Sequence, residues 1–144
     1  MFKKILVPLD GSPLAEEVLG LVEELAQVHG AEVMLLRVAF YHPLPGLDAQ
    51  EQEARAVEEA ENYLEGVAAG LRDKGLSVTT HVRYGQPCQE ILRHAQRHAD
   101  LVVMATHGLG GMLRWAMGSV ADRVVRRSLV PVLLIRSQDS DTSK

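Results

Sequence analysis

Several features that would each define a class of protein are scarce in this sequence. It has one cysteine in 144 residues, which excludes an internal disulfide and fits a reducing compartment. No apolar run approaches the roughly 18 residues of a membrane-spanning helix. The apolar stretch after Met1 is soon broken by Pro8 and Asp10, unlike a secretory signal. The net charge of −4 argues against general electrostatic binding to nucleic acid. We therefore expect a cytoplasmic protein that binds neither nucleic acid nor membranes.

Aromatic residues are also rare. The chain has one Trp, three Tyr and two Phe, so aliphatic residues and methionine must form most of its core. Cys88 has neither a cysteine partner nor a basic run beside it, and we interpret it as structural. His94 and His98 are four residues apart and could share a metal ion. Because no third ligand is evident, we interpret them as part of a solvated helix face.

The sequence does have a regular alternation of strand and helix signals. Short apolar runs predict strands, and apolar residues three or four positions apart predict helices. Ser12 can cap the first helix, and Gly30 can end it. The predicted strands span residues 4–9, 32–40, 76–84, 101–106 and 130–136, and the predicted helices span residues 12–30, about 50–74, 87–98 and about 118–128.

This alternation predicts an α/β fold with a single domain. The strands would form an open five-stranded parallel sheet with helices on both faces, a Rossmann-like arrangement with right-handed crossovers. Residues 1–137 would form the domain, and residues 138–144 a polar tail that we expect to be disordered. In such sheets a ligand binds beyond the carboxyl ends of the strands, where the strand order reverses. The loops after the first and fourth strands are therefore the expected site.

The loop after the fourth strand has the composition of a phosphate site. It runs from Ala105 to Ser119, as Ala-Thr-His-Gly, nine further residues and Gly-Ser. Glycine lets the backbone approach an anion closely, and the unpaired N–H groups of a helix N-terminus point toward it. The loop after the first strand supplies Asp10, whose carboxylate can accept hydrogen bonds from sugar hydroxyls. The alternative is that Asp10 only ties down its own turn and that the glycines only make a flexible loop.

Four segments of the chain resemble the universal stress protein family, across residues 2 to about 136. In order they are Ile5–Ser12, Glu32–Val38, Gly85–Pro87, and residues 105–119 with Pro131–Ile135. The resemblance implies the fold of the adenine nucleotide alpha hydrolase-like proteins. It also implies a homodimer that pairs through the C-terminal strand, with Val130, Val132 and Leu134 at the interface.

The ATP-binding branch of that family carries the pattern Gly-x2-Gly-x9-Gly-Ser/Thr. Gly108 matches the second glycine, Gly118 and Ser119 match the closing pair, and Ala105 stands in the place of the first glycine. Alanine adds one methyl group, and nothing at the end of a strand demands a positive φ. The resemblance therefore implies ATP or another adenine nucleotide as the ligand, with or without Mg²⁺.

The same resemblance implies which residues form the site. Asp10 would meet the ribose or the adenine, and Pro8 and the backbone of Val38 would flank the base. On the phosphate side, Gly108, Gly118, Ser119 and the backbone of Val120 would hold the phosphates, with Ala105 and His107 in the same loop. For His107 we expect a positioning or solvent-facing role, because no carboxylate stands near it in the sequence to orient it.

The resemblance therefore implies a stress-response sensor or regulator that binds an adenine nucleotide. We predict no catalytic residue. The chain lacks the Gly-Lys-Ser/Thr of a P-loop, and no residue is evidently placed to activate water, so efficient hydrolysis is not expected. Two alternatives stay open: a slow ATPase, and a nucleotide-free dimeric interaction module. The sequence does not indicate which adenine nucleotide is preferred.

Overall fold

The computed structural model describes residues 1–39, 45–106 and 116–136, with the side chains of 116–118 left out of that description. Five parallel strands form one sheet in the order β3-β2-β1-β4-β5. The strands are β1 (Lys4–Pro8), β2 (Glu32–Ala39), β3 (Val78–Tyr84), β4 (Leu101–Thr106) and β5 (Val132–Arg136). The helices are α1 (Pro13–Glu16), α2 (Leu19–His29), α3 (Ala49–Arg72), α4 (Pro87–His98) and α5 (Ala116–Arg127). The predicted α/β class and its five parallel strands are confirmed.

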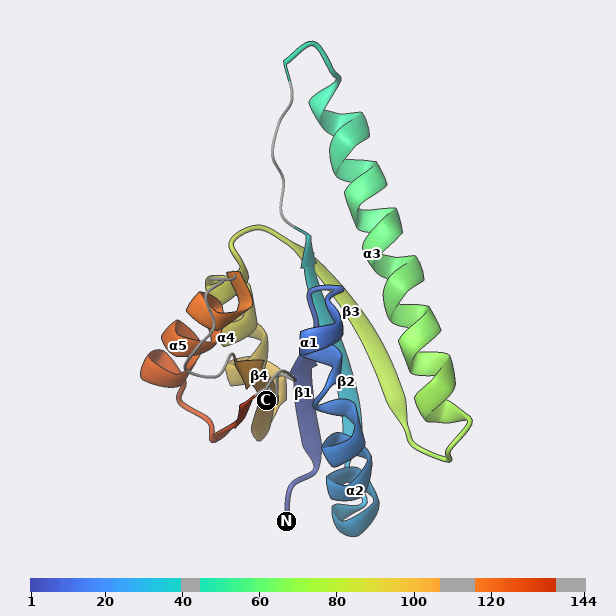
Figure 1. Cartoon of the computed structure of the whole chain (residues 1–144), viewed down its shortest axis with the longest axis vertical. Coiled ribbons are helices and arrows are strands. Elements are labelled where there is room, and N and C mark those ends of the chain that lie inside the picture. The colour runs from blue at the N-terminus through green and yellow to red at the C-terminus, as the bar shows by residue number, and fades with distance from the viewer. Residues whose placement is uncertain (40–44, 107–115, 137–144) are drawn as a thin grey trace, which may run out of the picture.

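Helices cover both faces of the sheet (Figure 1). α1, α2 and α3 lie on one face, where α1–α2 and α3 border a common groove, and α4 and α5 pack together on the other. Among the described strands, β1 lies at the centre, paired with β2 on one side and β4 on the other. The chain therefore moves in one direction from β1 to β3 and in the other from β4 to β5. The strand order reverses between β1 and β4, as the sequence predicts.

The first helical segment shows how local chemistry sets its ends. Ser12 adopts an extended conformation, its Oγ accepts a hydrogen bond from the Ala15 N–H at 3.2 Å, and Pro13 follows in the first turn. Gly30 ends α2 with a φ of 66°, a left-handed conformation that glycine adopts without a Cβ clash. The prediction of one helix from 12 to 30 is wrong at one point. The Glu17 N–H bonds the carbonyl of Leu14 three residues back, which tightens the turn and divides α1 from α2.

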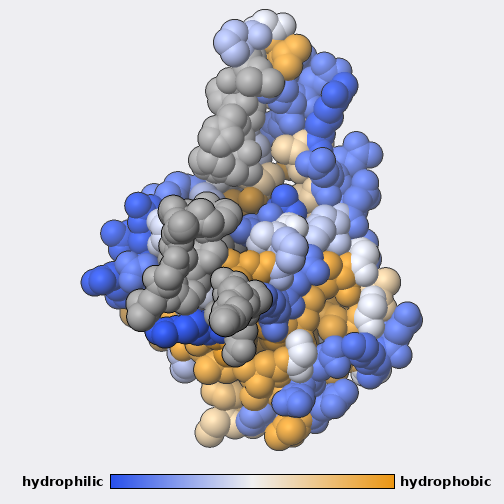
Figure 2. Space-filling view, in the orientation of Figure 1, coloured by the Kyte–Doolittle hydropathy of each residue, from blue (hydrophilic) through white to orange (hydrophobic). Residues whose placement is uncertain are grey.

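The core lies between the sheet and its helices. β1 and β4 are buried along most of their length, as expected for parallel strands with helices on both faces. α3 contributes its predicted stripe through Ala60, Leu64, Ala68 and Leu71, while its N-terminal half extends beyond the sheet (Figure 1). In the view of Figure 2, hydrophilic residues cover most of this protruding helix, and hydrophobic residues gather around the middle of the molecule. Cys88 is buried, in agreement with a structural role.

Two boundaries differ from the prediction in ways that matter below. α5 begins at Ala116 rather than at Gly118, so Gly118 and Ser119 lie within its first turn instead of opening it. β5 begins at Val132, two residues later than predicted. Among the residues that the structure describes, no helix combines the length and hydropathy needed to cross a bilayer. The predicted tail, residues 138–144, lies outside the described residues.

Candidate functional site

Asp10 stands just beyond the carboxyl end of β1 and is exposed to solvent. Its Oδ1 accepts two hydrogen bonds from Ser12, one from the backbone N–H at 2.9 Å and one from Oγ at 2.5 Å. These bonds fix the orientation of the carboxylate within its own turn. Among the described residues, Oδ2 has no hydrogen-bond partner, so it is available to a ligand. The turn-forming role and the ligand-binding role therefore fall on different oxygens of one side chain.

Pro8 and Val38 lie near Asp10, at the end of the sheet where the carboxyl ends of the strands meet. We call this end of the sheet the edge with Asp10. Pro8 is buried and pairs in register with Leu36 of β2, so Val38, two residues further along β2, reaches the level of Asp10. Val38 is half-buried and packs at the margin of the core. Pro8 thus precedes Asp10 by two residues, at the end of β1, and Val38 lies beside Asp10 on the adjacent strand β2. A flat, apolar ring could lie against this pair while a polar substituent reaches the carboxylate.

The carboxyl end of β4 lies beside that of β1 because the two strands pair directly. Ala105 is in regular strand geometry, pairs in register with Ile135, and is only 2% exposed. No non-glycine residue in the described parts of the chain has a positive φ, so alanine in place of the family's glycine causes no backbone strain here. His107 and Gly108 follow directly but lie outside the described residues.

The N-terminal turn of α5 supplies the other half of the expected site. Gly118 lies in this first turn, whose N–H groups lack partners inside the helix. Ser119 is exposed and Val120 is half-buried against the core. The helix dipole favours an anion at this end, and a serine hydroxyl here can add a hydrogen bond. Because α5 begins at Ala116, Ser119 completes its first turn, whereas Val120 is the fifth residue and its N–H faces the carbonyl of Ala116 within the helix.

The structure brings one further charged residue to this edge that sequence reasoning missed. The guanidinium of Arg37, near the end of β2, lies against Gly11: a Cβ placed on Gly11 would be 2.8 Å from Nη1 of Arg37. Gly11 has a φ of 88°, so both its backbone and its neighbour favour glycine. The available signal was an arginine inside an otherwise apolar strand. The Arg37 guanidinium therefore lies beside Gly11, the residue that follows Asp10 in the loop.

Arg37 belongs to a short row of polar side chains on the α3 face. Its guanidinium carbon lies 5.1 Å from the centre of the Tyr63 ring, a cation–π distance. The Tyr63 hydroxyl donates a hydrogen bond to Oε2 of Glu16 at 2.5 Å. Burial, and then the bonded carboxylate of Glu16, raise the pKa of Tyr63 above its usual range. Tyr63 therefore stays a neutral hydrogen-bond donor, and the row links α1, β2 and α3 beside Asp10.

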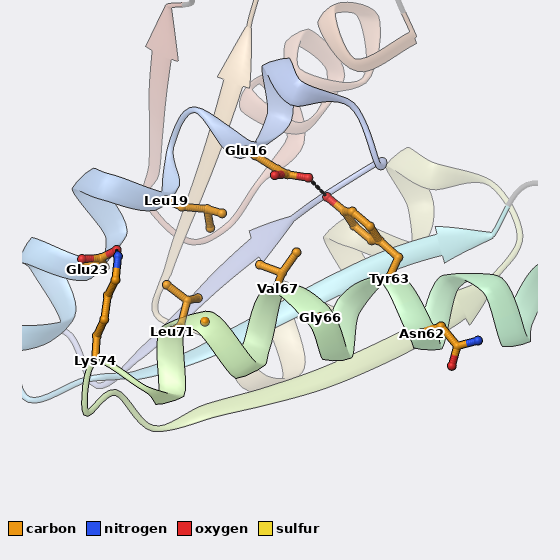
Figure 3. Close-up of a pocket in the computed structure, with 10 residues that line it drawn as sticks. Glu16, Leu19, Glu23, Asn62, Tyr63, Gly66, Val67, Leu71 and Lys74 are labelled. Carbon is orange, nitrogen blue, oxygen red and sulfur yellow. Dashed lines mark hydrogen bonds and ion pairs between the residues drawn. The ribbon is translucent and has the colours of Figure 1, made fainter.

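Below this row, an open groove of about 590 Å³ separates α1–α2 from α3 (Figure 3). Leu19, Val67 and Leu71 give it an apolar lining, and the ion pair between Lys74 and Glu23, 2.7 Å from Nζ to Oε2, spans its far end. Of the nine residues predicted for the nucleotide, none of the six whose side chains the structure describes lines this groove. The groove therefore adjoins the row beside Asp10 through Glu16 and Tyr63 but does not include Asp10 itself.

The interpretation of His94 as part of a solvated helix face is wrong. His94 is 4% exposed, because it follows Ile91 by three residues and shares the buried face of α4. Its ring centre lies 4.7 Å from those of His81 and of His98, which is exposed as expected. Burial is the largest cause that lowers the pKa of His94, to about 4, followed by the neighbouring charges of His81 and Arg83. Within the described residues, no group of three or more side chains is arranged to hold a metal ion.

The fold and this edge define the class: an open parallel α/β protein whose candidate ligand site lies where the strand order reverses. The sequence profile of the Universal stress protein family matches residues 1–136. The chain belongs to the universal stress protein family.

Individual members of the family are similar over nearly the whole chain. Universal stress protein MJ0531 of Methanocaldococcus jannaschii is 33% identical, covering 94% of this chain and 83% of its own. The solved structure of MJ0577, from the same organism, has a TM-score of 0.83 at 31% identity and covers 97% of this chain and 99% of its own. The universal stress protein from Archaeoglobus fulgidus, solved in complex with dAMP, has a TM-score of 0.69 at 25% identity and covers 92% and 97%.

Proposed function

We propose that this chain binds an adenine nucleotide at the edge where β1 and β4 end. Asp10 carries the proposal. One of its oxygens is held by Ser12, while no described residue hydrogen-bonds the other at the topological switch point. A ribose hydroxyl can donate to that second oxygen, with the base against Pro8 and Val38. The related protein from Archaeoglobus fulgidus, solved with dAMP, supports adenine nucleotides as the ligand class.

The phosphates would extend from the ribose toward the start of α5. Gly118 and Ser119 would hold them together with Gly108, and His107 would help to position this loop. The backbone N–H of Val120, which the sequence also suggested, is engaged within α5 and would contribute only through the helix dipole. We propose ATP, ADP or AMP as the ligand. Any Mg²⁺ would arrive with the phosphates, since no group of described residues is arranged to hold an ion by itself. The bound state would regulate a partner during a cytoplasmic stress response.

Asp10→Asn tests the role of the second oxygen. Asparagine keeps an oxygen for the two bonds from Ser12 but replaces Oδ2 with an amide NH2 group, which cannot accept a hydrogen bond. A hydrogen bond to a charged group contributes about 1.5–3 kcal/mol, so AMP affinity in isothermal titration calorimetry should fall about tenfold or more. The matched control is Asp100→Asn. Asp100 also accepts two backbone bonds, from Lys3 and Lys4 at 2.9 and 3.1 Å, but at the opposite edge of the sheet.

Equal AMP affinity in Asp10→Asn and the native chain would contradict the assignment of Asp10. Analysis of the small molecules released when the purified protein is denatured would identify the nucleotide and its phosphorylation state. If no nucleotide is released and none binds on titration, the chain is better described as a nucleotide-free interaction module. If ATP is bound and slowly consumed, loss of turnover in Asp10→Asn and in Ser119→Ala would favour the slow ATPase.

We further propose that two chains pair through β5. β5 ends the described sheet, so its outer edge offers unpaired backbone groups that would invite association. Leu134 is 38% exposed, and Val130 and Val132 are only partly buried. Leu134→Lys places a charge on this edge and should convert a dimer to a monomer in light scattering, whereas Val28→Lys, on exposed α2, should not. A native chain that is already monomeric would contradict the proposal.

A further inference from the structure

A second concentration of charge lies on the face of the sheet that α4 covers, between the edge strand β3 and helix α4. A small cavity of about 30 Å³ opens there, lined mainly by basic side chains. We call this group the β3–α4 basic cluster; it consists of His81, Arg83, Arg93, His94, Arg97 and His98.

The alternation of β3 explains how the cluster forms. Thr80 hydrogen-bonds Glu65 of α3 at 2.9 Å, so it faces α3. His81, the next residue, points to the opposite face of the sheet, as does Arg83. There the His81 ring meets His94 of α4, at 4.7 Å between ring centres. α4 then adds His98 one turn further on, in contact with the other side of the His94 ring.

The environment of His94 indicates that a group from outside the chain completes the cluster. Its side chain is buried, yet Nε2 has no hydrogen-bond partner among the described residues. A buried nitrogen without a partner is costly and uncommon in native proteins. An acceptor from outside the chain would satisfy this nitrogen once it carries a proton.

The charges of the cluster are poorly balanced. Among the described residues, one carboxylate lines the cavity, that of Glu90, and it pairs with Arg93 at 2.7 Å. Arg83 donates to the backbone carbonyl of the neighbouring Val82 and forms no ion pair with a described residue. Arg97 forms no ion pair with any described residue. The cluster therefore carries an excess of positive charge around an unpaired imidazole nitrogen.

The negative end of the α4 dipole accounts for part of this arrangement. Cations in the last helical turn are stabilised by the dipole, which explains Arg97 and His98. It does not explain Arg83, which comes from a different element, nor the buried His94. A metal ion does not suit the cluster either, because the surrounding arginines would repel it.

We propose that the β3–α4 basic cluster binds a phosphate-type oxyanion. Arg83 and Arg97 would form charge-assisted hydrogen bonds with its oxygens, and His94 would donate from Nε2. At about 30 Å³ the cavity has room for about one oxygen-sized group, so most of the anion would lie in solvent. Arg83 pairs in register with Val38, so the cluster begins one strand away from the residues proposed to flank the base and extends from there through His94 to His98, toward the amino ends of the strands. Of the described residues proposed for the nucleotide, none lines its cavity, and we therefore propose it as a second site.

Histidine ring signals in NMR spectra give a direct test. Orthophosphate, titrated against chloride at equal ionic strength, should shift the ring signals of His81, His94 and His98 in a saturable manner. It should also raise the pKa of His94, because a nearby anion favours the protonated ring. Pyrophosphate should act at lower concentration, since it offers more charge to the arginines. Failure of phosphate to move these signals more than chloride does would overturn the proposal.

Charge-removing variants make the test specific. Arg83→Gln combined with Arg97→Gln should weaken the phosphate effect about tenfold or more, through loss of charge-assisted bonds. Arg126→Gln combined with Arg127→Gln is the matched control, because it removes the same two charges from exposed residues of α5, where Arg126 pairs with Asp122 at 3.1 Å. If the double variant and the control respond to phosphate alike, the proposal is wrong. Preserved amide spectra verify that each variant is folded.

AMP separates this site from the proposed nucleotide site. Saturation with AMP should leave the phosphate response of His94 in place, and the Arg83 and Arg97 variant should bind AMP as the native chain does. Loss of the phosphate response on adding AMP would mean that phosphate acts only at the nucleotide site, which would refute the second site. A chain that binds no AMP but retains the response would refute the nucleotide proposal alone.

Discussion

Replacing His94 with phenylalanine should reduce the loss of stability that the protein suffers in mild acid. The buried imidazole has a pKa of about 4 in the folded chain, against 6.5 for an unperturbed histidine. Between these two values the unfolded chain binds a proton that the folded chain does not, so the free energy of unfolding falls as the pH falls. Below about pH 4 the loss is complete.

The magnitude follows from the shift. A difference of about 2.5 pKa units, at about 1.4 kcal/mol per unit, amounts to roughly 3 kcal/mol for His94 alone. His81 adds to it in the same direction, since burial and the charges of Arg83 and His98 also lower its pKa. Glu32 acts on His81 in the opposite direction. A phenylalanine at position 94 keeps a ring between the neighbouring histidines but cannot bind a proton.

The assay is urea denaturation at a series of pH values from about 7 to 4, in buffers without phosphate. The native chain should lose about 3 kcal/mol more than His94→Phe across this range. All the carboxylates are common to both proteins, so their contributions cancel in the difference. His94→Asn provides a second comparison with a smaller side chain. Parallel stability curves for the native chain and both variants would refute the reasoning.

Three further substitutions test the edge with Asp10. Gly11→Ala and Gly46→Ala should each cost about 1 kcal/mol in urea denaturation, because φ is 88° and 85° at these positions. Only Gly11→Ala should also weaken AMP binding in calorimetry, since nothing lies within 4 Å of a Cβ at Gly46, whereas one at Gly11 displaces Arg37. Tyr63→Phe should cost about 1 kcal/mol through the lost hydrogen bond to Glu16. It should also remove a step above the usual tyrosine range from an alkaline absorbance titration, because burial and the carboxylate of Glu16 raise the pKa of Tyr63.

The order of elements was predictable because each local signal agrees with the fold. The predicted bounds of α4 and β4 match the structure, since Pro87 fixes the start of the helix and a continuous apolar run marks the buried strand. The break between α1 and α2 was not predictable from periodicity. Leu14, Val18 and Leu21 keep helical spacing across it, while a single three-residue hydrogen bond changes the assignment.

The errors at individual side chains have a different cause. The exposure of a histidine depends on what packs against its helix face, and the sequence of α4 does not contain β3. His94 is buried because the neighbouring strand places His81 over it, and polarity alone favoured the solvent. Arg37 was missed for the same reason, since its partners Gly11 and Tyr63 come from two other elements. Long-range pairs of this kind require the assembled fold.

The alanine that departs from the family's glycine pattern illustrates how structure can resolve a sequence argument. A glycine is required where φ is positive or where another group needs the space of the Cβ. Ala105 does not have a positive φ, because it lies in register with Ile135 within a regular β-ladder. Ala105 as a whole is 2% exposed, so it lies within the packed part of β4. The substitution is therefore a packing change within β4, and it gives no reason to prefer the nucleotide-free alternative.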